Sequence, residues 1–335
     1  MDSRLTALSA WVRDVLEQPD LCIEVASADA SFRRYFRASA RGRTWIVMDA
    51  PPDKEDVEPY IKVAETLCAA GVNAPRILAR HADGFLLLTD LGNSTYLAAL
   101  ADSSQADRLY GDALAALLLM QTRCVAGAQV LPAYDAPLLR REMELFPEWF
   151  LQRHLGIAVD AGLREQLDEQ FQLLIDSALA QPRVFVHRDY HSRNLMVTHG
   201  SLGPNPGVLD FQDAVYGPIT YDLVSLLRDC YIAWPLDRVH QWSLGYRRTA
   251  HDAGLIADVD EAVWLRWFDL MGMQRHLKAI GIFARLWHRD GKSGYLGDIP
   301  RTLGYVRAAA ANDSRFGVLV KLIDERIAPL LGRAS

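Results

Sequence analysis

A polar loop between two apolar stretches, at residues 184–197, constrains the fold of this chain more than any other segment. Val184–Val186 and Leu195–Val197 have the length and composition of buried strands, which we expect to form a hairpin. The loop between them places five ionisable residues and Asn194 within eight positions. Asp189 stands near the start of this loop, and Asn194 follows it by five residues. The segment therefore predicts two strands that present a set of polar side chains from the loop that joins them.

A third apolar stretch, Val208–Leu209, ends in Asp210, sixteen residues after Asn194. Phosphoryl transfer uses an Asp that takes a proton from the acceptor hydroxyl, and an Asn and a second Asp that hold Mg²⁺ on the phosphates. The spacing predicts Asp189 as this base, and Asn194 and Asp210 as the Mg²⁺ ligands. Gln212 stands where the usual Asp-Phe-Gly signature has its glycine.

Two other interpretations of this loop remain open in the sequence. A polar loop between strands is often only a solvated turn, and short motifs arise by chance. Alternatively, His187, Asp189 and His191 alternate along the chain and could bind a transition metal from one face of a strand, as in a metallohydrolase. That interpretation leaves Asn194 and Asp210 without a role, so we adopt phosphoryl transfer as the prediction.

Composition limits the class of protein. The chain has 335 residues, of which 50% are hydrophobic and 23% charged, so it can bury a sizeable core. This length predicts about two domains. The net charge of −6 and the lack of a Lys/Arg-rich run argue against nucleic acid as a partner.

The terminal segment and the cysteines point to the compartment. Charged residues such as Asp2 and Arg4 interrupt the N-terminal segment, so we expect no secretion signal. The four cysteines are far apart in the sequence, which is typical of a reducing environment. No apolar run approaches the length of a membrane span. We therefore expect a cytoplasmic protein, a monomer, with no membrane partner.

Residues 1–91 predict a small lobe made mainly of strands. Helical spacing of apolar residues predicts a helix over Leu5–Leu16, and two turns separate the strand signals that follow. The strands are expected over Ile23–Val25, Phe32–Ser39 and Thr44–Met48. After them, we expect a helix over Glu55–Ala70 and strands over Pro75–Leu78 and Phe85–Thr89.

The turn Ala26–Ser31 would cover the phosphates of a nucleotide, yet it contains no glycine. We expect Ser31 and Arg33 to make the contacts that a glycine-rich loop would make elsewhere. Met48 stands where a phosphate-binding Lys is expected at the end of the third strand. Lys54 and Lys62 are the nearest alternatives, and the sequence does not indicate which residue replaces that Lys.

A turn-rich connector after Phe85–Thr89 is the expected boundary between a lobe at 1–91 and a second lobe at 92–335. Adenine is expected to bind there, at Thr89, Asp90 and Leu91. Beyond it, helical periodicity dominates, and strand signals return only at Val184. The helices are expected over Tyr96–Leu100, Arg108–Thr122, Leu138–Leu155, Glu165–Leu179, Leu223–Ile232 and Val263–Trp287. Together the two lobes predict an α+β fold.

The acceptor of the phosphoryl group is expected on the helices of the second lobe. Sugars are held by planar polar groups and an aromatic face, and the segment 141–149 concentrates both kinds of residue. We predict Glu144, Trp149 and Arg275 as acceptor-binding residues. Aromatic residues serve packing just as often, so Phe146 and Trp149 could equally be core residues.

Three motifs resemble the aminoglycoside-phosphotransferase-like family of small-molecule kinases, which share the protein-kinase fold. The motifs are His187–Asn194, Leu209–Ala214 and Gly217–Leu223. More narrowly, three N-terminal segments are similar to a bacterial subgroup of amino-sugar kinases. These segments are Ala30–Arg37, Met48–Pro52 and Gly84–Gly92.

This resemblance implies a two-lobed kinase-like fold, with an antiparallel sheet in the N-terminal lobe and a mostly helical C-terminal lobe. It further implies transfer of the γ-phosphoryl group of ATP, with Mg²⁺, to the anomeric hydroxyl of N-acetylmuramate or N-acetylglucosamine, whose 1-phosphate feeds cell-wall recycling. Met48 in place of Lys agrees with the subgroup. An aminoglycoside or choline is an alternative acceptor. A second alternative is a nucleotide-binding regulator without turnover, because Met48 and the glycine-free turn depart from the usual kinase pattern.

Overall fold

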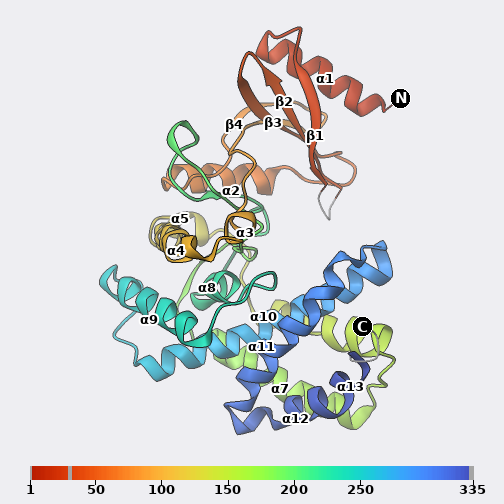
Figure 1. Ribbon diagram of the computed structural model, residues 1–335, viewed down its shortest axis with the longest axis vertical. Coiled ribbons are helices and arrows are strands. Elements are labelled where there is room, and N and C mark those ends of the chain that lie inside the picture. Colours follow the sequence, from red (N-terminus) through yellow and green to blue (C-terminus); the bar gives the residue numbers. More distant parts are fainter. Residues whose placement is uncertain (1, 29–31, 332–335) are drawn as a thin grey trace. The chain divides into compact units, whose positions relative to one another are not determined.

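The computed structural model describes residues 2–28 and 32–331, and its internal contacts divide the chain into two compact units. The first unit comprises residues 1–120 and 193–213, and the second comprises 121–192 and 214–335 (Figure 1). Both helices and antiparallel strands are present, which confirms the α+β prediction. The predicted lobe boundary after residue 91 stays a prediction, and each unit is described separately below.

The first unit is built around a five-stranded antiparallel sheet with the order β1-β2-β3-β5-β4. Its strands are β1 (Cys22–Ala28), β2 (Arg34–Ala40), β3 (Arg43–Asp49), β4 (Ile77–Arg80) and β5 (Phe85–Thr89). The register pairs Tyr35 of β2 and Leu86 of β5 with Met48 of β3. All five strands lie within two or three residues of the segments that apolar alternation predicted.

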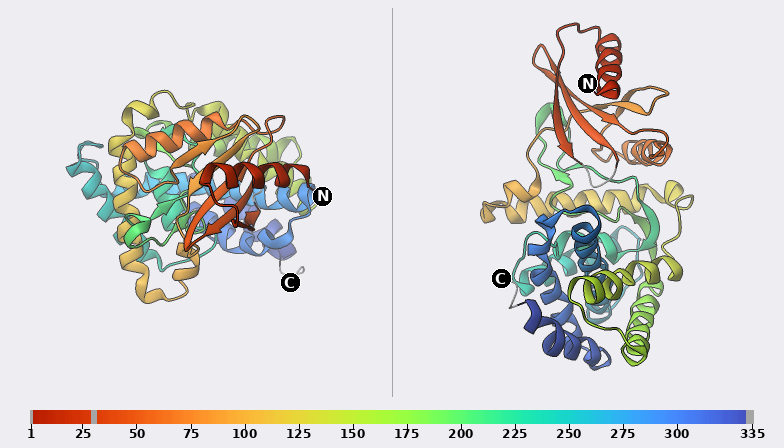
Figure 2. Two further views of the ribbon diagram at one scale, coloured as in Figure 1. Left: turned by 90° about the horizontal axis from the view of Figure 1, so that it is seen from above. Right: turned by 90° about the vertical axis from the view of Figure 1, so that its right-hand side faces the viewer.

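The helix α1 (Ser3–Leu16) packs on one face of this sheet (Figures 1 and 2). Asp2 caps its first turn by accepting the N–H groups of Arg4 and Leu5. The apolar stripe of α1 is buried against alternate residues of the strands. Successive side chains of a strand point to opposite faces of the sheet, so every second residue faces the helix. This core contains Leu8, Val12, Phe36, Ala38, Val47, Phe85 and Leu87.

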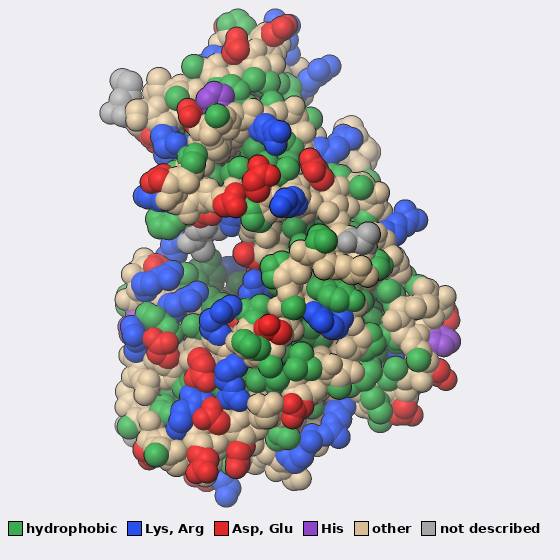
Figure 3. All heavy atoms as spheres, turned by 180° about the vertical axis from the view of Figure 1, so that it is seen from behind, with side chains coloured by type: hydrophobic (Ala, Val, Ile, Leu, Met, Phe, Trp, Pro, Cys, Tyr) green, Lys and Arg blue, Asp and Glu red, His purple; other side chains and the backbone are tan. Residues whose placement is uncertain are grey.

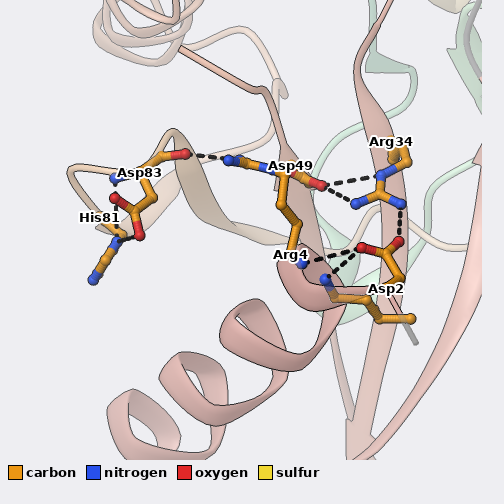
Figure 4. A network of polar contacts seen from close by, with 7 residues as sticks. Asp2, Arg4, Arg34, Asp49, His81 and Asp83 are labelled. Atoms are coloured by element: carbon orange, nitrogen blue, oxygen red, sulfur yellow. Dashed lines mark hydrogen bonds and ion pairs between the residues drawn. The ribbon is translucent and has the colours of Figure 1, made fainter. Parts of the chain in front are cut away.

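Ion pairs fix the N-terminus of α1 to the end of β3. The fully buried carboxylate of Asp49 accepts hydrogen bonds from Nε of Arg4 at 2.9 Å and from Nε of Arg34 at 3.0 Å (Figure 4). Arg34 also pairs with Asp2, and Arg4 donates to the carbonyl oxygen of Asp83 at 2.8 Å. The two guanidinium groups together compensate a carboxylate that would otherwise be an isolated buried charge.

The rest of the first unit consists of helices and the segment 193–213. The helices are α2 (Glu58–Ala69), α3 (Tyr96–Ala99), η1 (Ser103–Gln105) and most of α4 (Ala106–Arg123). The segment 193–213 contains β7 (Leu195–Met196), η3 (Gly200–Leu202) and β8 (Gly207–Val208). The strands β7 and β8 pair with each other, and Leu209 N–H donates to the Asn194 carbonyl oxygen at 2.9 Å. The same short sheet therefore positions Asn194 and the residue before Asp210.

The second unit is mostly helical and is organised around α10 (Glu261–Asp290), whose buried residues run along most of its length. The helices that pack on α10 include α6 (Ala136–Met143), η2 (Phe146–His154), α7 (Ala161–Leu179), α8 (Thr220–Leu227), α9 (Leu236–Asp252), η4 (Ser293–Asp298) and α11 (Ile299–Ala311). The other helices are α5 (Val125–Ala128), η5 (Ser314–Phe316), α12 (Gly317–Lys321), η6 (Leu322–Ile327) and α13 (Ala328–Leu331). A two-stranded sheet of β6 (Arg183–Val186) and β9 (Val215–Pro218) completes the unit.

Three predictions about local structure were wrong. The strands at 184–186 and 195–197 do not form a hairpin, because β6 pairs with β9 and β7 pairs with β8. The helix predicted over 138–155 is divided into α6 and the π-helical η2, which begins beside Pro147, a residue without the N–H that an α-helix needs. The helix predicted over 223–232 ends at Leu227, and Arg228 leaves the helical conformation with φ −118° and ψ 54°.

The surface and the helices carry two further observations. Figure 3 shows Lys/Arg and Asp/Glu side chains interspersed across the face that it draws, with no single sign dominating. Within residues 2–28 and 32–331, no helix combines the length and the apolar character that a bilayer span requires.

Candidate active site

The loop that carries Asp189 is held by a buried carboxylate in the second unit. Asp222, in the first turn of α8, accepts the backbone N–H of His187 at 2.6 Å and that of Arg188 at 3.0 Å. Arg188 adopts a left-handed backbone conformation with φ 76°, which is strained for a residue with a Cβ. Such strain persists where the surroundings over-determine it, and it often accompanies functional loops.

Asp189 lies among positive charges. Burial would raise the pKa of the Asp189 carboxyl, but the charges of Lys278, His191, Arg275 and Arg188 outweigh burial and hold that pKa below its ordinary value. The carboxylate is therefore ionised throughout the neutral range. This is the form in which a general base can accept a proton.

Asp222 shows the opposite behaviour. Burial raises the pKa of Asp222 to about 7, even though the two backbone N–H groups that it accepts favour the ionised form. The negative charge of Asp189 adds to this increase. Two neighbouring carboxyl groups with pKa values pushed in opposite directions are typical of sites that handle protons.

The predicted metal ligands lie together in the first unit. Nδ2 of Asn194 donates to Oδ2 of Asp210 at 3.1 Å, and Nε2 of Gln212 donates to Oδ1 of Asp210 at 2.8 Å. Asp210 has a left-handed backbone, with φ 63°, which is uncommon for a residue with a Cβ. Gln212, the residue that departs from the usual signature, therefore orients the predicted ligand.

These residues fit a magnesium ion in the chemistry of their donors. Mg²⁺ prefers oxygen ligands and is usually held by one or two carboxylates together with substrate phosphates. Asp210 supplies a carboxylate and Asn194 an amide oxygen. Beside them, the buried Oε1 of Gln212 has no hydrogen-bond partner among the described residues. An unsatisfied buried oxygen at this position is what a hydrated cation would complete.

The predicted adenine-binding residues have structural contacts of their own. Thr89 exchanges hydrogen bonds with Arg76, accepting its N–H on the side-chain hydroxyl at 2.9 Å. Asp90 accepts Nε of Arg37 at 2.7 Å, and Leu91 is buried. Adenine binding by this segment stays a prediction. Ser31 lies outside the described residues.

Leu91 packs closely on β8. A Cβ built on Gly207 would lie 2.9 Å from Cδ1 of Leu91 and 3.1 Å from Cγ2 of Thr198. Only glycine fits there without a shift of its neighbours. The glycine of β8 thus allows the end of the main sheet to approach the short sheet that positions Asn194.

Met48 and Tyr60 occupy the region where a kinase would have its Lys–Glu ion pair. Met48 is fully buried on β3, and Tyr60 is buried on α2, whereas Glu58 and Glu65 of the same helix are exposed. The ring of Tyr60 also contacts Phe211, with ring centroids 4.8 Å apart. Neither Glu58 nor Glu65 is therefore placed like the buried partner of a phosphate-binding cation.

The charges of Arg33 and Asp210 both act on the hydroxyl group of Tyr60. Burial raises the pKa of Tyr60 well above its ordinary value, and the nearby Tyr35 raises it further, while the charge of Arg33 lowers it and that of Asp210 raises it. Both charges thus act on one hydroxyl group. Of the predicted nucleotide residues that the structure describes, Arg33 is the one whose charge acts on the same hydroxyl as a predicted metal ligand.

Each of the predicted acceptor residues has structural contacts of its own, and acceptor binding by them stays a prediction. The carboxylate of Glu144 pairs with Nη1 of Arg164 at 2.7 Å, and the ring of Trp149 stacks under Arg153, whose Cζ is 3.9 Å from the ring centroid. Arg275 is buried and acts on Asp189, and its Nη1 donates to Sγ of Cys230 at 3.7 Å. Phe146 is fully buried, so its interpretation as a core residue is confirmed.

Sequence reasoning missed the residues that surround the Asp189 loop. Glu142 and Lys278 are buried charged residues that pair with each other at 3.0 Å, and Asp229 accepts the N–H of Ser192 at 2.9 Å. One signal was available: Glu142 follows the buried Leu139 by three residues, so it shares the apolar face of α6, whereas Glu144 does not.

The structure gives no support to the alternative of a transition-metal site at His187, Asp189 and His191. In the part of the chain that the structure describes, no group of three or more His, Cys, Asp or Glu side chains is placed to hold a metal ion. His187 instead has its ring against Tyr190, with centroids 5.6 Å apart. Its backbone serves the loop through Asp222, as described above.

Comparison with known proteins decides the family. Residues 23–266 match the model of the phosphotransferase enzyme family. The chain belongs to this family. As the motifs at His187–Asn194 and Asp210 predicted, it is a phosphotransferase that acts on a hydroxyl group.

Curated relatives of this phosphotransferase match it along nearly its whole length. The N-acetylmuramate/N-acetylglucosamine kinase of Pseudomonas aeruginosa is 48% identical, and the match covers 96% of this chain and 96% of the relative. The proteins of the same name from Pseudomonas putida and Neisseria meningitidis are 46% and 43% identical, with coverage of 96–97%. The predicted resemblance to this subgroup is confirmed.

Solved structures confirm the protein-kinase-like fold of the phosphotransferase. An ethanolamine kinase from Plasmodium vivax superposes with a TM-score of 0.62 at 12% identity, covering 88% of this chain and 85% of that one. The GDP complex of wild-type aminoglycoside 2'-phosphotransferase-IIIa gives a TM-score of 0.59 at 17% identity, with coverage of 93% and 99%.

Proposed function

We propose that this phosphotransferase is an ATP-dependent kinase that phosphorylates the anomeric hydroxyl of N-acetylmuramate and N-acetylglucosamine. The observation that carries the proposal is the 43–48% identity, along the whole chain, to three proteins named for these two acceptors. The products are sugar 1-phosphates that serve the recycling of cell-wall sugars. The protein acts as a monomer in the cytoplasm.

Asp189 is the proposed general base. The anomeric oxygen forms a bond to the γ-phosphorus while the bond from that phosphorus to the β–γ bridging oxygen breaks, and ADP leaves. The hydroxyl proton passes to the Asp189 carboxylate. An anomeric hydroxyl is more acidic than an ordinary alcohol, so a carboxylate with a lowered pKa is a sufficient base.

Asn194 and Asp210 are the proposed ligands of Mg²⁺. When bound, Mg²⁺ neutralises the charge of the nucleotide phosphates. Gln212 holds the Asp210 carboxylate in place by donating from Nε2 at 2.8 Å. Asn194 would hold the ion through its amide oxygen and Asp210 through its carboxylate.

The nucleotide is proposed to bind the first unit, with adenine at the backbone of Thr89, Asp90 and Leu91 and the phosphates at Ser31 and Arg33. Arg33 would supply the cation that Met48 cannot. Side chains alternate between the two faces of a strand, and Phe36 of β2 faces the α1 core. Arg34 therefore faces α1 as well. Arg33 is expected on the opposite face of the sheet, together with Tyr35 and the residue paired with it, Met48.

This assignment predicts different outcomes for two neighbouring arginines. Arg33→Met should raise the KM for ATP, because a charge-assisted hydrogen bond to phosphate contributes about 1.5–3 kcal/mol, or roughly 10–100-fold. Arg34→Met is the matched control: it breaks the ion pair with Asp49 and should lower Tm with little effect on the KM for ATP. Equal ATP KM values for Arg33→Met and wild type would show that another group binds the phosphates.

The acceptor is proposed to bind the second unit through Glu144, Trp149 and Arg275. Support differs among the three. Arg275 is buried beside Asp189, and its Nε has no hydrogen-bond partner among the described residues. Glu144 and Trp149 already have partners in Arg164 and Arg153, which a sugar would have to share or displace.

An acceptor screen tests the proposed function. Purified protein with MgATP should consume ATP when N-acetylmuramate or N-acetylglucosamine is added, and far less with choline or an aminoglycoside. Phosphorus NMR of the product should show phosphate on C1. The methyl glycoside of N-acetylglucosamine is the matched control, because it lacks only the anomeric hydroxyl and should not be phosphorylated.

Two results would overturn this function. Turnover of the methyl glycoside, or phosphate on another carbon, would exclude the anomeric position. ATP binding without turnover of any acceptor would favour a nucleotide-binding regulator.

A further inference from the structure

A buried carboxylate, Glu142 of α6, collects four donors behind the Asp189 loop. Only 5% of Glu142 is exposed. Oε1 accepts Nζ of Lys278 at 3.0 Å and pairs with Nη2 of Arg188, while Oε2 accepts the hydroxyl of Tyr134 and lies 3.4 Å from Nε2 of Gln274. A carboxylate this well satisfied is rigid, because every direction of its oxygens is occupied.

Lys278 is as deeply placed as its partner. It lies within α10 and is 8% exposed, and its Nζ also contacts the hydroxyl of Tyr221 at 3.0 Å. Tyr221 and Tyr134 meet edge to face, with ring centroids 5.1 Å apart, which closes the cluster with aromatic rings. Burying an ammonium group is unfavourable unless it is paired. Packing alone would be served better by an apolar side chain, so the buried charge of Lys278 indicates a further role.

The cluster reaches Asp189 through its neighbour in the chain. The side chain of Arg188 is held by Glu142, and the backbone N–H of Arg188 is held by Asp222 at 3.0 Å. Between these two anchors, Arg188 keeps its left-handed conformation, with φ 76°. The residue that follows such a turn has its direction set by the turn, and that residue is Asp189.

We propose that Glu142 and Lys278 are positioning residues that fix the orientation of Asp189, Glu142 through Arg188 and Lys278 through its charge. This inference rests on the proposed role of Asp189 as the base. Neither residue touches the acceptor. Their pair spans α6 and α10, so the catalytic carboxylate takes its geometry from two helices that lie far from it in the sequence.

The charges that face Asp189 define what a change in Lys278 should do. They are Lys278 and Arg275 of α10, Arg188 and His191 of the same loop, and Asp222 of α8. Burial opposes ionisation of Asp189, and Lys278 is the strongest of the cations that keep its pKa low. Removing the Lys278 charge should therefore raise the pKa of the base. As the pH is lowered, the variant should then lose activity at a higher pH than wild type does, so the acidic limb of its pH profile moves to higher pH.

A double-mutant cycle separates positioning from packing. Glu142→Gln leaves two buried cations, Lys278 and Arg188, without their carboxylate and should lower Tm strongly, whereas Lys278→Met leaves Glu142 paired with Arg188 and should lower Tm less. Each should also lower kcat, by up to about 100-fold, since small displacements of a reacting group have effects of this size. The double variant removes the stranded Lys278 charge but leaves Arg188 without its carboxylate, so it should recover only part of the Tm that Glu142→Gln loses. It should keep the low kcat, and its acidic limb should stay at the higher pH.

The matched control is Arg285→Met, which removes another partly buried cation of α10 and should leave the pH profile unchanged. Recovery of kcat and of the wild-type pH profile in the double variant would show that the pair is only structural. An unchanged kcat in Lys278→Met would also overturn the inference. Wild type is assayed in parallel: if it phosphorylates no amino sugar, the proposed function fails, and the cycle is measured with whichever hydroxyl acceptor it does use.

Discussion

Asp189→Asn should abolish turnover while leaving the affinity for MgATP nearly intact. The substitution keeps the size of the side chain but replaces the carboxylate with a neutral amide that is too weak a base to take the proton. Removal of a general base typically lowers kcat by about 10²–10⁴-fold. In the proposed mechanism the base contacts the acceptor hydroxyl and not the nucleotide. Steady-state kinetics give kcat, and calorimetric titration gives the affinity for MgATP.

The control for Asp189→Asn is Asp176→Asn, which changes an exposed carboxylate on α7 of the same unit. It should retain the kinetics of wild type. Since Asp189 lies among cations, the thermal stability of Asp189→Asn must be measured as well. A folded Asp189→Asn protein that keeps more than half of its activity would contradict the assignment of the base.

Asp210→Ala should lose Mg²⁺-dependent ATP binding together with turnover. Changing second-shell partners of a metal lowers affinity or activity by about 10–100-fold, and removing a ligand should exceed this. Calorimetric titration of ATP with and without Mg²⁺ measures the effect. Gln212→Ala is the graded comparison, because it removes only the hydrogen bond that orients Asp210 and should produce a smaller loss.

One outcome would move the metal site. If Asp210→Ala showed the full enhancement of ATP binding by Mg²⁺, the ligand would lie elsewhere. Asp213, three residues further along the chain, would then be the next candidate.

The sequence allowed prediction of those parts of the molecule that depend on local order. Asp189, Asn194 and Asp210 were recognisable because phosphoryl transfer needs these residue types at fixed offsets. The strands of the main sheet and α1 followed from short-range alternation and helical spacing, as the burial of Leu8, Val12 and Phe36 shows. Features of this kind require no knowledge of distant partners.

Pairing between distant segments could not be predicted in the same way. The strand before Asp189 pairs with β9, and the strand after Asn194 pairs with β8, so the expected hairpin was wrong although both strands exist. Strand propensity identifies an edge that needs a partner, and it does not identify the partner.

The buried charges were missed for a related reason. Glu142 and Lys278 are far apart in the sequence, although they form an ion pair in the structure. From the sequence alone, each would be interpreted as an exposed residue on an amphipathic helix. Glutamates at positions 142 and 144 point in different directions, since residues two apart on a helix do not share a face. We predicted a role for Glu144 from the sequence, whereas the structure buries Glu142 beside Lys278 of α10.

The anchoring of α1 determines how the first unit comes apart. Chain ends usually fray with little loss of free energy, and their amides then exchange with solvent quickly. Here Arg4 holds a carboxylate that no water reaches, and Arg34 shares it. Opening α1 would leave Asp49 with one partner and would uncover the apolar residues beneath the helix. The N-terminal helix therefore belongs to the same cooperative unfolding unit as β2 and β3, and trimming the first few residues would weaken the sheet.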